Sequence, residues 1–292
     1  MAAQMIDFSI IIPHYNIPHS LQRLLDTIPD EPNLEVIVID DNSDKETEAL
    51  KQIIDKYSND RRIFLKNVID NKGAGASRNI GIQHARGKWL IFADSDDMFG
   101  EDFYRIISGN KDRSEDLIFF MPYSINPENG EMSNRHIEFC KILEKYYDCP
   151  NKENEYVLRY QVVSPWSKLI RREMVTNNSI FFENSKVAND VVFCRKIGFY
   201  AKEIAVEKDT FYIVTERTGS LTGFKDKSSF EIRLNEFIKG AGFIRENVDA
   251  DTWKEIGING SIMIHTCMKN KYGILELFKT MVTLLKNGIR IA

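Results

Sequence analysis

The sequence predicts an α/β fold built on a mostly parallel sheet flanked by helices. In the first 121 residues, short apolar runs alternate with segments of helical pattern, which is typical of successive strand–helix units. The apolar runs are continuous rather than alternating, so their strands are expected to be buried on both faces. With 292 residues, of which 43% are hydrophobic, the chain is long enough to build a large core.

The expected elements follow one another in a regular order. Five strands are predicted, at residues 9–12, 35–39, 63–65, 89–93 and 117–120. Helices are predicted between them at residues 21–27, 44–57 and 76–85. Ser43 and Glu46 have the spacing of a capping box at the start of the second helix, and Gly87 follows the third.

The rest of the chain divides into three parts by composition. Residues 122–160 carry three prolines and many charges and predict an excursion outside the core. A second ordered block is expected from Val162 to about Leu221, and residues 225–292 have a helical pattern. We therefore expect a main domain over residues 1–224, with halves 1–121 and 122–224, and a helical C-terminal subdomain over 225–292.

Charge and cysteine usage exclude several functions. The net charge is −4, whereas a nucleic-acid partner would call for a basic surface. The four cysteines lack C-x-x-C spacing, which argues against a zinc or redox motif and fits reduced thiols. The first residues do not resemble a signal peptide, and no apolar run reaches the length of about 18 residues that spans a bilayer. These features predict a cytoplasmic protein.

Polar side chains follow three of the predicted strands. They are the segments Pro13-His14-Tyr15-Asn16, Asp40-Asp41-Asn42-Ser43 and Asp94-Ser95-Asp96-Asp97. In open α/β sheets, ligands bind outside the carboxyl ends of the strands. We therefore expect these three segments to converge on one crevice.

Asp94, Asp96 and Asp97 lie within four residues after a buried strand. Carboxylates so close together raise one another's pKa unless a cation neutralises them, and Mg²⁺ is usually held by one or two carboxylates with substrate phosphates completing its shell. A solvated acidic turn is the alternative.

A glycine-bearing segment, 71–79, precedes a predicted helix. Its backbone N–H groups, with Lys72 and Arg78, predict a phosphate site at a helix N-terminus, and Asp41 is a candidate acceptor for a base or ribose. The alternative is that Gly73 and Gly75 only turn the chain.

These motifs, in this order and spacing, resemble glycosyltransferase family 2. The resemblance is carried by residues 11–16, 38–43, 71–81 and 87–97 and is close over residues 8–121. It continues more loosely through 165–169, 189–193 and 217–221 and does not reach the C-terminal helices. It implies a GT-A fold and a nucleotide-sugar-dependent transferase.

The resemblance also implies roles for residues in the first half. Pro13, Tyr15 and Asn16 would frame the nucleotide, and Asp41 would meet its base, commonly uracil. Asp94 and Ser95 would lie at the ribose and sugar side of the donor. Asp96 would be the metal ligand of the D-x-D element, with Asp94 beside it, and Mn²⁺ or Mg²⁺ would bridge the diphosphate. Lys72 and Arg78 would assist the departure of the leaving group through their positive charges. Asp97 would either support the site or cap a helix starting near Glu101.

The family places a general base in an acidic pair at the start of a helix, and Asp190 stands at that position. The first member of that acidic pair is often Glu, but this sequence has Asn189 there. The motif is therefore partial, and the catalytic role falls on Asp190. The alternative is that Asp190 has no catalytic role and only stabilises the dipole of the helix that it starts. Trp166 is either a sugar platform or a core residue, and Arg217 and Ser220 match a late loop that would close over the diphosphate.

The tail, residues 274–286, is amphipathic at helical spacing. Docking on the main domain, contact with the inner face of the cell membrane as a peripheral protein, and a homodimer interface all stay open.

The predicted function is therefore an inverting, metal-dependent transfer of a sugar from a UDP-sugar to an acceptor sugar hydroxyl. The acceptor would be a saccharide or a lipid-linked saccharide, in bacterial surface polysaccharide or glycolipid assembly. A sugar nucleotidyltransferase, a D-x-D phosphatase and a sugar-nucleotide-binding homologue without turnover are the alternatives.

Overall fold

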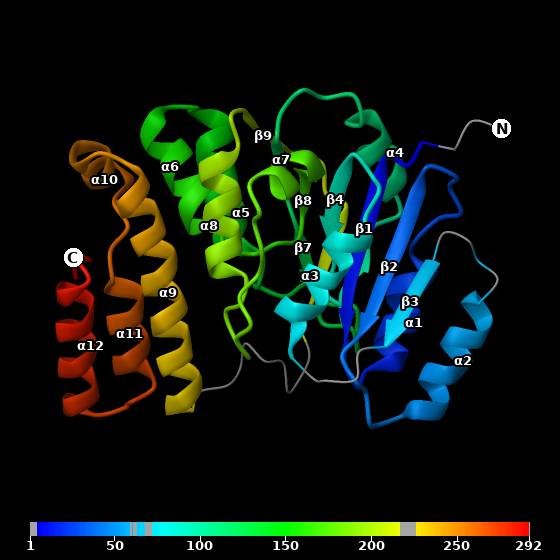
Figure 1. Cartoon of the computed structure of the whole chain (residues 1–292), viewed down its shortest axis with the longest axis horizontal. Coiled ribbons are helices and arrows are strands. Elements are labelled where there is room, and N and C mark those ends of the chain that lie inside the picture. The colour runs from blue at the N-terminus through cyan, green and yellow to red at the C-terminus, as the bar shows by residue number, and fades with distance from the viewer. Residues whose placement is uncertain (1–4, 59, 61–62, 68–71, 217–225, 292) are drawn as a thin grey trace.

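The computed structural model describes residues 5–58, 60, 63–67, 72–216 and 226–291 (Figure 1). A seven-stranded sheet crosses the molecule in the order β3-β2-β1-β4-β8-β6-β9. Its strands are β1 (Phe8–His14), β2 (Leu34–Asp40), β3 (Ile63–Asn67), β4 (Trp89–Phe92), β6 (Leu117–Phe120), β8 (Lys168–Arg171) and β9 (Ile204–Glu207). The predicted α/β fold with a mostly parallel sheet is confirmed.

Strand β1 lies between β2 and β4 and is parallel to both. In this register His14 lies beside Asp40 at the ends of β1 and β2. Strand β8 is antiparallel to both β4 and β6, and it is the one reversed strand among the described members of this sheet. The carboxyl ends of β1, β2 and β4 therefore meet at one edge of the sheet.

A smaller sheet lies beside this edge. Its strands are β5 (Met98–Phe99), β7 (Tyr123–Ile125) and β10 (Tyr212–Thr215), in the order β5-β10-β7. Strand β5 follows the acidic segment directly in the chain, and β10 pairs with it antiparallel. The small sheet thus brings a segment more than a hundred residues away against the end of β4.

Two apolar cores cover the two faces of the large sheet. Because successive strand residues point to opposite faces, Ile10 and Ile12 enter one core and Ile11 enters the other. The first core is covered by α1 (Pro18–Asp26), α2 (Thr47–Tyr57) and α4 (Phe103–Gly109). The second is covered by α3 (Ala74–His84), α5 (Ile137–Asp148), α6 (Lys152–Gln161), α7 (Arg172–Asn177) and α8 (Val191–Tyr200).

The last four described helices form a separate layer around a third core (Figure 1). They are α9 (Lys227–Asn247), α10 (Ala250–Ile256), α11 (Ser261–Lys269) and α12 (Ile274–Lys286). Helix α9 lies along α8, where the Arg195 guanidinium donates to the Phe237 carbonyl at 2.7 Å. The predicted helical subdomain is thus present, although its proposed boundary at residues 224 and 225 lies outside the described residues. None of the described helices combines the length and apolarity needed to cross a membrane.

The prediction that residues 122–160 lie outside the core was wrong. Leu143 of α5 and Leu158 of α6 are fully buried in the second core. The prolines stand near the ends of elements, and most of the charges on these two amphipathic helices are exposed, whereas Arg159 is buried.

The predicted capping box was also wrong. Helix α2 begins at Thr47, and its N-cap, Glu46, has a left-handed backbone and no capping hydrogen bond from its side chain. The Ser43 hydroxyl instead donates to the Asp40 carboxylate at 2.5 Å and accepts from the Asn16 backbone N–H at 2.8 Å. The Ser43 hydroxyl therefore bonds to Asp40 at the end of β2 and does not cap α2.

Candidate active site

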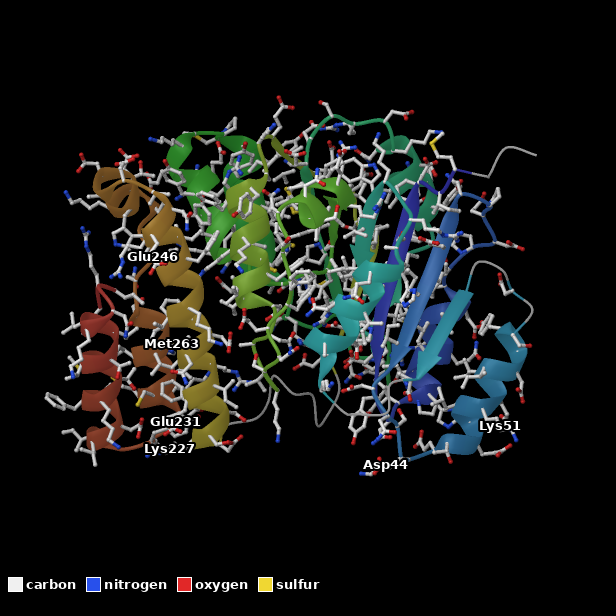
Figure 2. The ribbon with its side chains drawn as sticks, viewed as in Figure 1. Asp44, Lys51, Lys227, Glu231, Glu246 and Met263 are labelled. Atoms are coloured by element: carbon white, nitrogen blue, oxygen red, sulfur yellow. The ribbon has the colours of Figure 1, made fainter. Side chains whose placement is uncertain are left out.

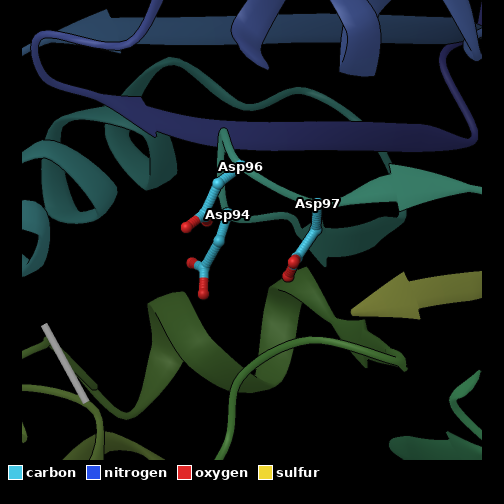
Figure 3. A group of neighbouring side chains, drawn as sticks. All are labelled: Asp94, Asp96 and Asp97. Carbon is cyan, nitrogen blue, oxygen red and sulfur yellow. The ribbon is translucent and has the colours of Figure 1, made fainter. Parts of the chain in front are cut away.

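The three carboxylates that follow β4 form one cluster. Asp94, Asp96 and Asp97 each have a carboxylate oxygen within 4.8 Å of the others, and all three side chains leave the same short loop (Figure 3). Three hard oxygen donors at this spacing fit a divalent cation such as Mg²⁺ or Mn²⁺. The three carboxylates differ in their other partners.

Asp97 is tied to strand β10. The Tyr212 hydroxyl donates to its carboxylate at 2.7 Å, and the Thr215 backbone N–H donates to the other oxygen at 2.7 Å. Burial, with the nearby charges of Asp94 and Asp96, raises the pKa of Asp97 well above its usual range. The alternative that Asp97 caps the next helix was wrong, because α4 begins at Phe103 with Asp102 as its N-cap. Asp97 therefore anchors the loop.

The same strand also fixes the loop backbone. The Tyr212 hydroxyl accepts from the Asp94 N–H at 2.9 Å, and the Thr215 hydroxyl donates to the Asp96 carbonyl at 2.5 Å. Arg23, from α1, donates to that carbonyl at 2.7 Å. These bonds orient the main chain from which the Asp94 and Asp96 carboxylates project.

Asp94 is joined to the other half of the site through Arg78. The Arg78 guanidinium donates to Asp94 at 2.5 Å and to the Asn189 side-chain oxygen at 2.9 Å. It also lies 5.2 Å from the centroid of the Phe182 ring. Arg78 is buried, so its charge acts in a medium of lower dielectric than water. One cation thus links the acidic loop to the segment that precedes α8.

Asp190 is the N-cap residue of α8 and comes directly after Asn189. Burial raises the pKa of Asp190, while the charges of Arg78 and Lys168 oppose this rise and that of Asp94 adds to it. A carboxylate whose pKa is raised in this way holds a proton more strongly than an ordinary aspartate, as a general base must. Asn189 has its own task, since its amide donates to the Ser185 carbonyl at 3.2 Å.

The ends of β1 and β2 are joined by polar contacts. The His14 ring lies 2.7 Å from the buried Asp40 carboxylate, and the Asn16 side-chain oxygen accepts from the backbone N–H groups of Asp44 and Lys45 at 2.9 Å. Pro13 is buried within β1. Tyr15 is 46% exposed at the same edge of the sheet. Of the residues predicted to frame the nucleotide, Tyr15 thus presents the largest open surface.

Asp41 has backbone partners in this structure. Its carboxylate accepts from the Lys72 N–H at 3.0 Å and the Gly73 N–H at 2.7 Å. Gly73 has a φ of +88°, a conformation that favours glycine. A side chain at Gly75 would overlap the Glu183 carbonyl. The backbone conformation at Gly73 and the close packing at Gly75 therefore explain both glycines without a ligand. The contacts of this segment with a phosphate, and of Asp41 with a base, stay predictions.

Lys168 is a site neighbour that sequence reasoning did not single out. Its side chain is fully buried, its ammonium donates to the Ser164 carbonyl, and it lies 5.2 Å from the centroid of the Phe119 ring. Burial lowers the pKa of Lys168 to about 8, with Cys194 and Asp190 opposing. A lysine at the start of an apolar strand run is the one signal that the sequence offers.

Two other residues from the looser motifs have different outcomes. Trp166 stacks on Tyr212 with ring centroids 5.6 Å apart and on Phe139 at 4.9 Å, so it packs against both cores. Its neighbours favour a core role over a sugar platform. Arg217 and Ser220 lie outside the described residues.

Known proteins share both sequence and fold with this chain. The profile of Glycosyl transferase family 2 matches residues 9–177. The poly(ribitol-phosphate) beta-N-acetylglucosaminyltransferase TarS of Staphylococcus aureus is 28% identical over 223 residues, which are 74% of this chain and 36% of TarS. A poly(ribitol-phosphate) beta-glucosyltransferase of Bacillus spizizenii is 30% identical over 72% of this chain and 32% of its own length. The chain thus spans about a third of each of these relatives.

Solved structures agree on the architecture. TarS 1–349 in complex with UDP-GlcNAc superposes with a TM-score of 0.63 at 22% identity, covering 89% of this chain and 81% of that one. The mannosyltransferase PcManGT of Pyrobaculum calidifontis, in complex with GDP-Man and Mn²⁺, has a TM-score of 0.56 at 15% identity, covering 97% of this chain and 76% of that one. The family profile covers more than half of the chain, and the fold agrees with it. The chain therefore belongs to glycosyltransferase family 2 and is a GT-A glycosyltransferase.

Proposed function

We propose that this glycosyltransferase moves a sugar from a UDP-sugar to a hydroxyl of a saccharide acceptor, with inversion at the anomeric carbon. The observation that carries the proposal is the chain of contacts from Asp94 through Arg78 to Asn189, which precedes Asp190. It links a cluster suited to a diphosphate-bound cation to the segment that carries Asp190, a half-buried carboxylate suited to accept a proton. An inverting transfer needs these two parts on opposite faces of the anomeric carbon, because the acceptor attacks from the face away from the departing diphosphate.

The donor half of the proposal rests on the strand ends. Pro13, Tyr15 and Asn16 would border the nucleoside, and Asp41 would orient the loop that meets the base through its bonds to Lys72 and Gly73. A UDP-sugar is favoured because the TarS structure of the same fold holds UDP-GlcNAc. Ser95 is buried between the two acids that face the donor.

Mn²⁺ or Mg²⁺ would be held by Asp96 and Asp94, and when bound it would neutralise charge on the departing nucleoside diphosphate. The cluster fits such an ion because Asp97 is already fastened by Tyr212 and Thr215. Asp94 and Asp96 would then ligate the cation, and donor phosphates would complete its shell. Arg78 adds positive charge behind Asp94, which limits repulsion between the carboxylates.

Asp190 would take the proton from the acceptor hydroxyl as that oxygen attacks the anomeric carbon. Asp190 is half-buried, so an acceptor hydroxyl could reach it, and its raised pKa improves its match to a sugar hydroxyl. Lys168, beneath the same region, supplies a compensating positive charge.

The acceptor side is inferred from the relatives. Both curated relatives are named for transfer to poly(ribitol-phosphate), so we infer an acceptor that is a saccharide or polyol of a bacterial surface polymer, free or lipid-linked. We also infer a cytoplasmic location. Its support is that all four cysteines are free thiols, as is usual in reducing compartments.

The test begins with donor and metal binding. A thermal-shift panel of UDP-, GDP- and TDP-sugars with Mn²⁺ should raise the melting temperature most with a UDP-sugar, because a ligand of the native state stabilises it. In titration calorimetry, Asp96→Ala should lose the Mn²⁺-dependent part of UDP binding, whereas Asp102→Ala, an exposed carboxylate on α4, should not. Unchanged UDP affinity in Asp96→Ala would remove Asp96 from the metal site.

A further inference from the structure

Helix α12 buries two polar residues beside an apolar one, and it exposes four large apolar side chains. Glu276, Thr280 and Leu284, spaced four residues apart, are buried against the neighbouring helices. The exposed side holds four large apolar residues, which we call the α12 face: Ile274 (86% exposed), Leu275 (66%), Phe278 (63%) and Leu285 (58%). A helix that only docked on its own domain would have the opposite arrangement.

The buried polar residues have partners, so this orientation of α12 is specified. Lys227, at the start of α9, lies 2.6 Å from the Glu276 carboxylate. The Thr280 hydroxyl donates to the Glu276 carbonyl at 2.8 Å. Turning the helix to bury the α12 face would break this ion pair and leave the Glu276 carboxylate without Lys227. The apolar side is thus held outward by the polar side.

The segment that carries the α12 face is basic. Residues 261–292 contain five basic side chains and one acidic one, Glu276, although the whole chain has a net charge of −4. The basic residues are Lys269, Lys271, Lys279, Lys286 and Arg290. Because Glu276, the one acid of this segment, is buried and paired with Lys227, the exposed charges of the segment itself are positive. Exposed apolar side chains on a helix that also exposes Lys279 and Lys286 match the boundary between lipid tails and anionic headgroups.

The start of α12 lies at the same edge of the molecule as the candidate active site. Figure 1 shows the turn between α11 and α12 at the lower edge, where β1 and β2 also end. Figure 2 places Lys227, the partner of Glu276, at that edge too. Strand β4 is parallel to β1, so the acidic loop leaves the sheet on this side as well. A surface that met the first turns of α12 would lie near the open side of the site.

We propose that the α12 face docks on an anionic membrane surface. Phe278, with Ile274 and Leu275, enters the headgroup boundary, and the lysines contact lipid phosphates. A second copy of this chain is a poorer occupant, because two such faces would oppose one positive region with another. The inference stands independently of the proposed transfer reaction, since it concerns where the protein lies and not what it transfers.

The experiment is co-sedimentation of the whole chain with vesicles. Vesicles of equal parts phosphatidylcholine and phosphatidylglycerol should bind the protein, and those of phosphatidylcholine alone should bind it less. Phe278→Asp should weaken partitioning into the anionic vesicles by about tenfold or more, as expected for loss of one buried aromatic side chain. Lys279→Gln with Lys286→Gln should also weaken it and reduce its dependence on salt.

The matched control is Met132→Asp, because Met132 is 65% exposed and lies far from α12 in the chain. It should bind vesicles as the parent does, and all variants should keep the parent's circular dichroism and melting temperature. Equal vesicle binding by Phe278→Asp and the parent would overturn the proposal, as would no binding of the parent. A dimer in sedimentation equilibrium that Phe278→Asp abolishes would instead assign the face to a second copy.

Discussion

The Tyr212 hydroxyl lies 2.7 Å from the Asp97 carboxylate and 2.9 Å from the backbone nitrogen of Asp94. One side chain on β10 therefore holds two residues of the acidic loop, although it lies 115 residues from Asp97 in the chain. Burial and the Asp97 charge raise the pKa of this tyrosine well above its usual range, so the hydroxyl keeps the proton that it donates.

Tyr212→Phe should destabilise the fold and weaken metal-dependent donor binding. The substitution leaves a buried N–H and a buried carboxylate without this partner, at a cost of about 1–3 kcal/mol in the free energy of unfolding. Urea denaturation and calorimetric titration of UDP with Mn²⁺ would measure the two effects. Tyr147→Phe, at a tyrosine that is 46% exposed, is the control and should change neither. A stable variant with full UDP affinity would show that the Asp94 loop holds its shape without β10.

Asp190→Asn should keep the affinity for UDP-sugar and lower kcat by about a hundredfold to ten-thousandfold, as loss of a general base does. In the parent, kcat/KM should decrease as the pH is lowered and Asp190 becomes protonated. The apparent pKa of this decrease should be above the usual 3.8, because burial raises the pKa of Asp190. The pH profile of the residual rate in the variant should lack this decrease. Near-normal turnover in Asp190→Asn would place the base elsewhere.

Lys168→Met should change how stability depends on alkaline pH. Burial lowers the pKa of Lys168 from 10.5 to about 8, so the folded state disfavours its charged form. The lowered pKa therefore reduces the free energy of unfolding by its full amount below pH 8. This reduction, about 3 kcal/mol, disappears as the pH rises from 8 to 10.5. The parent should therefore gain stability relative to Lys168→Met between these pH values in urea denaturation. A constant difference across the interval would contradict the lowered pKa.

Gly75→Ala should damage the site, whereas Gly109→Ala should be harmless. A Cβ at Gly75 would overlap the Glu183 carbonyl and press on Asn189, which accepts the Arg78 bond. A Cβ at Gly109, also helical, meets nothing within 4 Å. We expect reduced melting temperature and turnover for Gly75→Ala and a neutral or slightly raised melting temperature for Gly109→Ala. Similar behaviour of the two variants would mean that the 183–189 segment moves aside at little cost.

The strands and the convergence of their polar ends could be predicted from sequence because both are local properties. Continuous apolar runs specify buried strands, and the polar residues after β1, β2 and β4 must share an edge in a parallel sheet. The roles of Tyr212 and Thr215 could not be predicted, because these residues read as an ordinary short strand until β10 is placed beside the acidic loop.

One local pattern failed because a tertiary partner outcompeted it, and a second left its outcome open. Ser43 has the spacing of a helix cap, but Asp40 and Asn16 lie closer to its hydroxyl. The helical tail has a clear amphipathic pattern, but which side faces inward depends on Lys227 being available to Glu276. Pattern alone left open whether Phe278 faces the domain or the surface.

The anchoring of the acidic loop by β10 has a consequence for exchanging parts between members of the family. Residues 94–97 and Tyr212–Thr215 form one interlocked unit assembled from two distant stretches of chain. A chimera that takes the loop after β4 from a relative but keeps β10 of this chain would lose the hydrogen bonds that join the two segments. Donor specificity should therefore transfer between relatives only when both stretches are exchanged together.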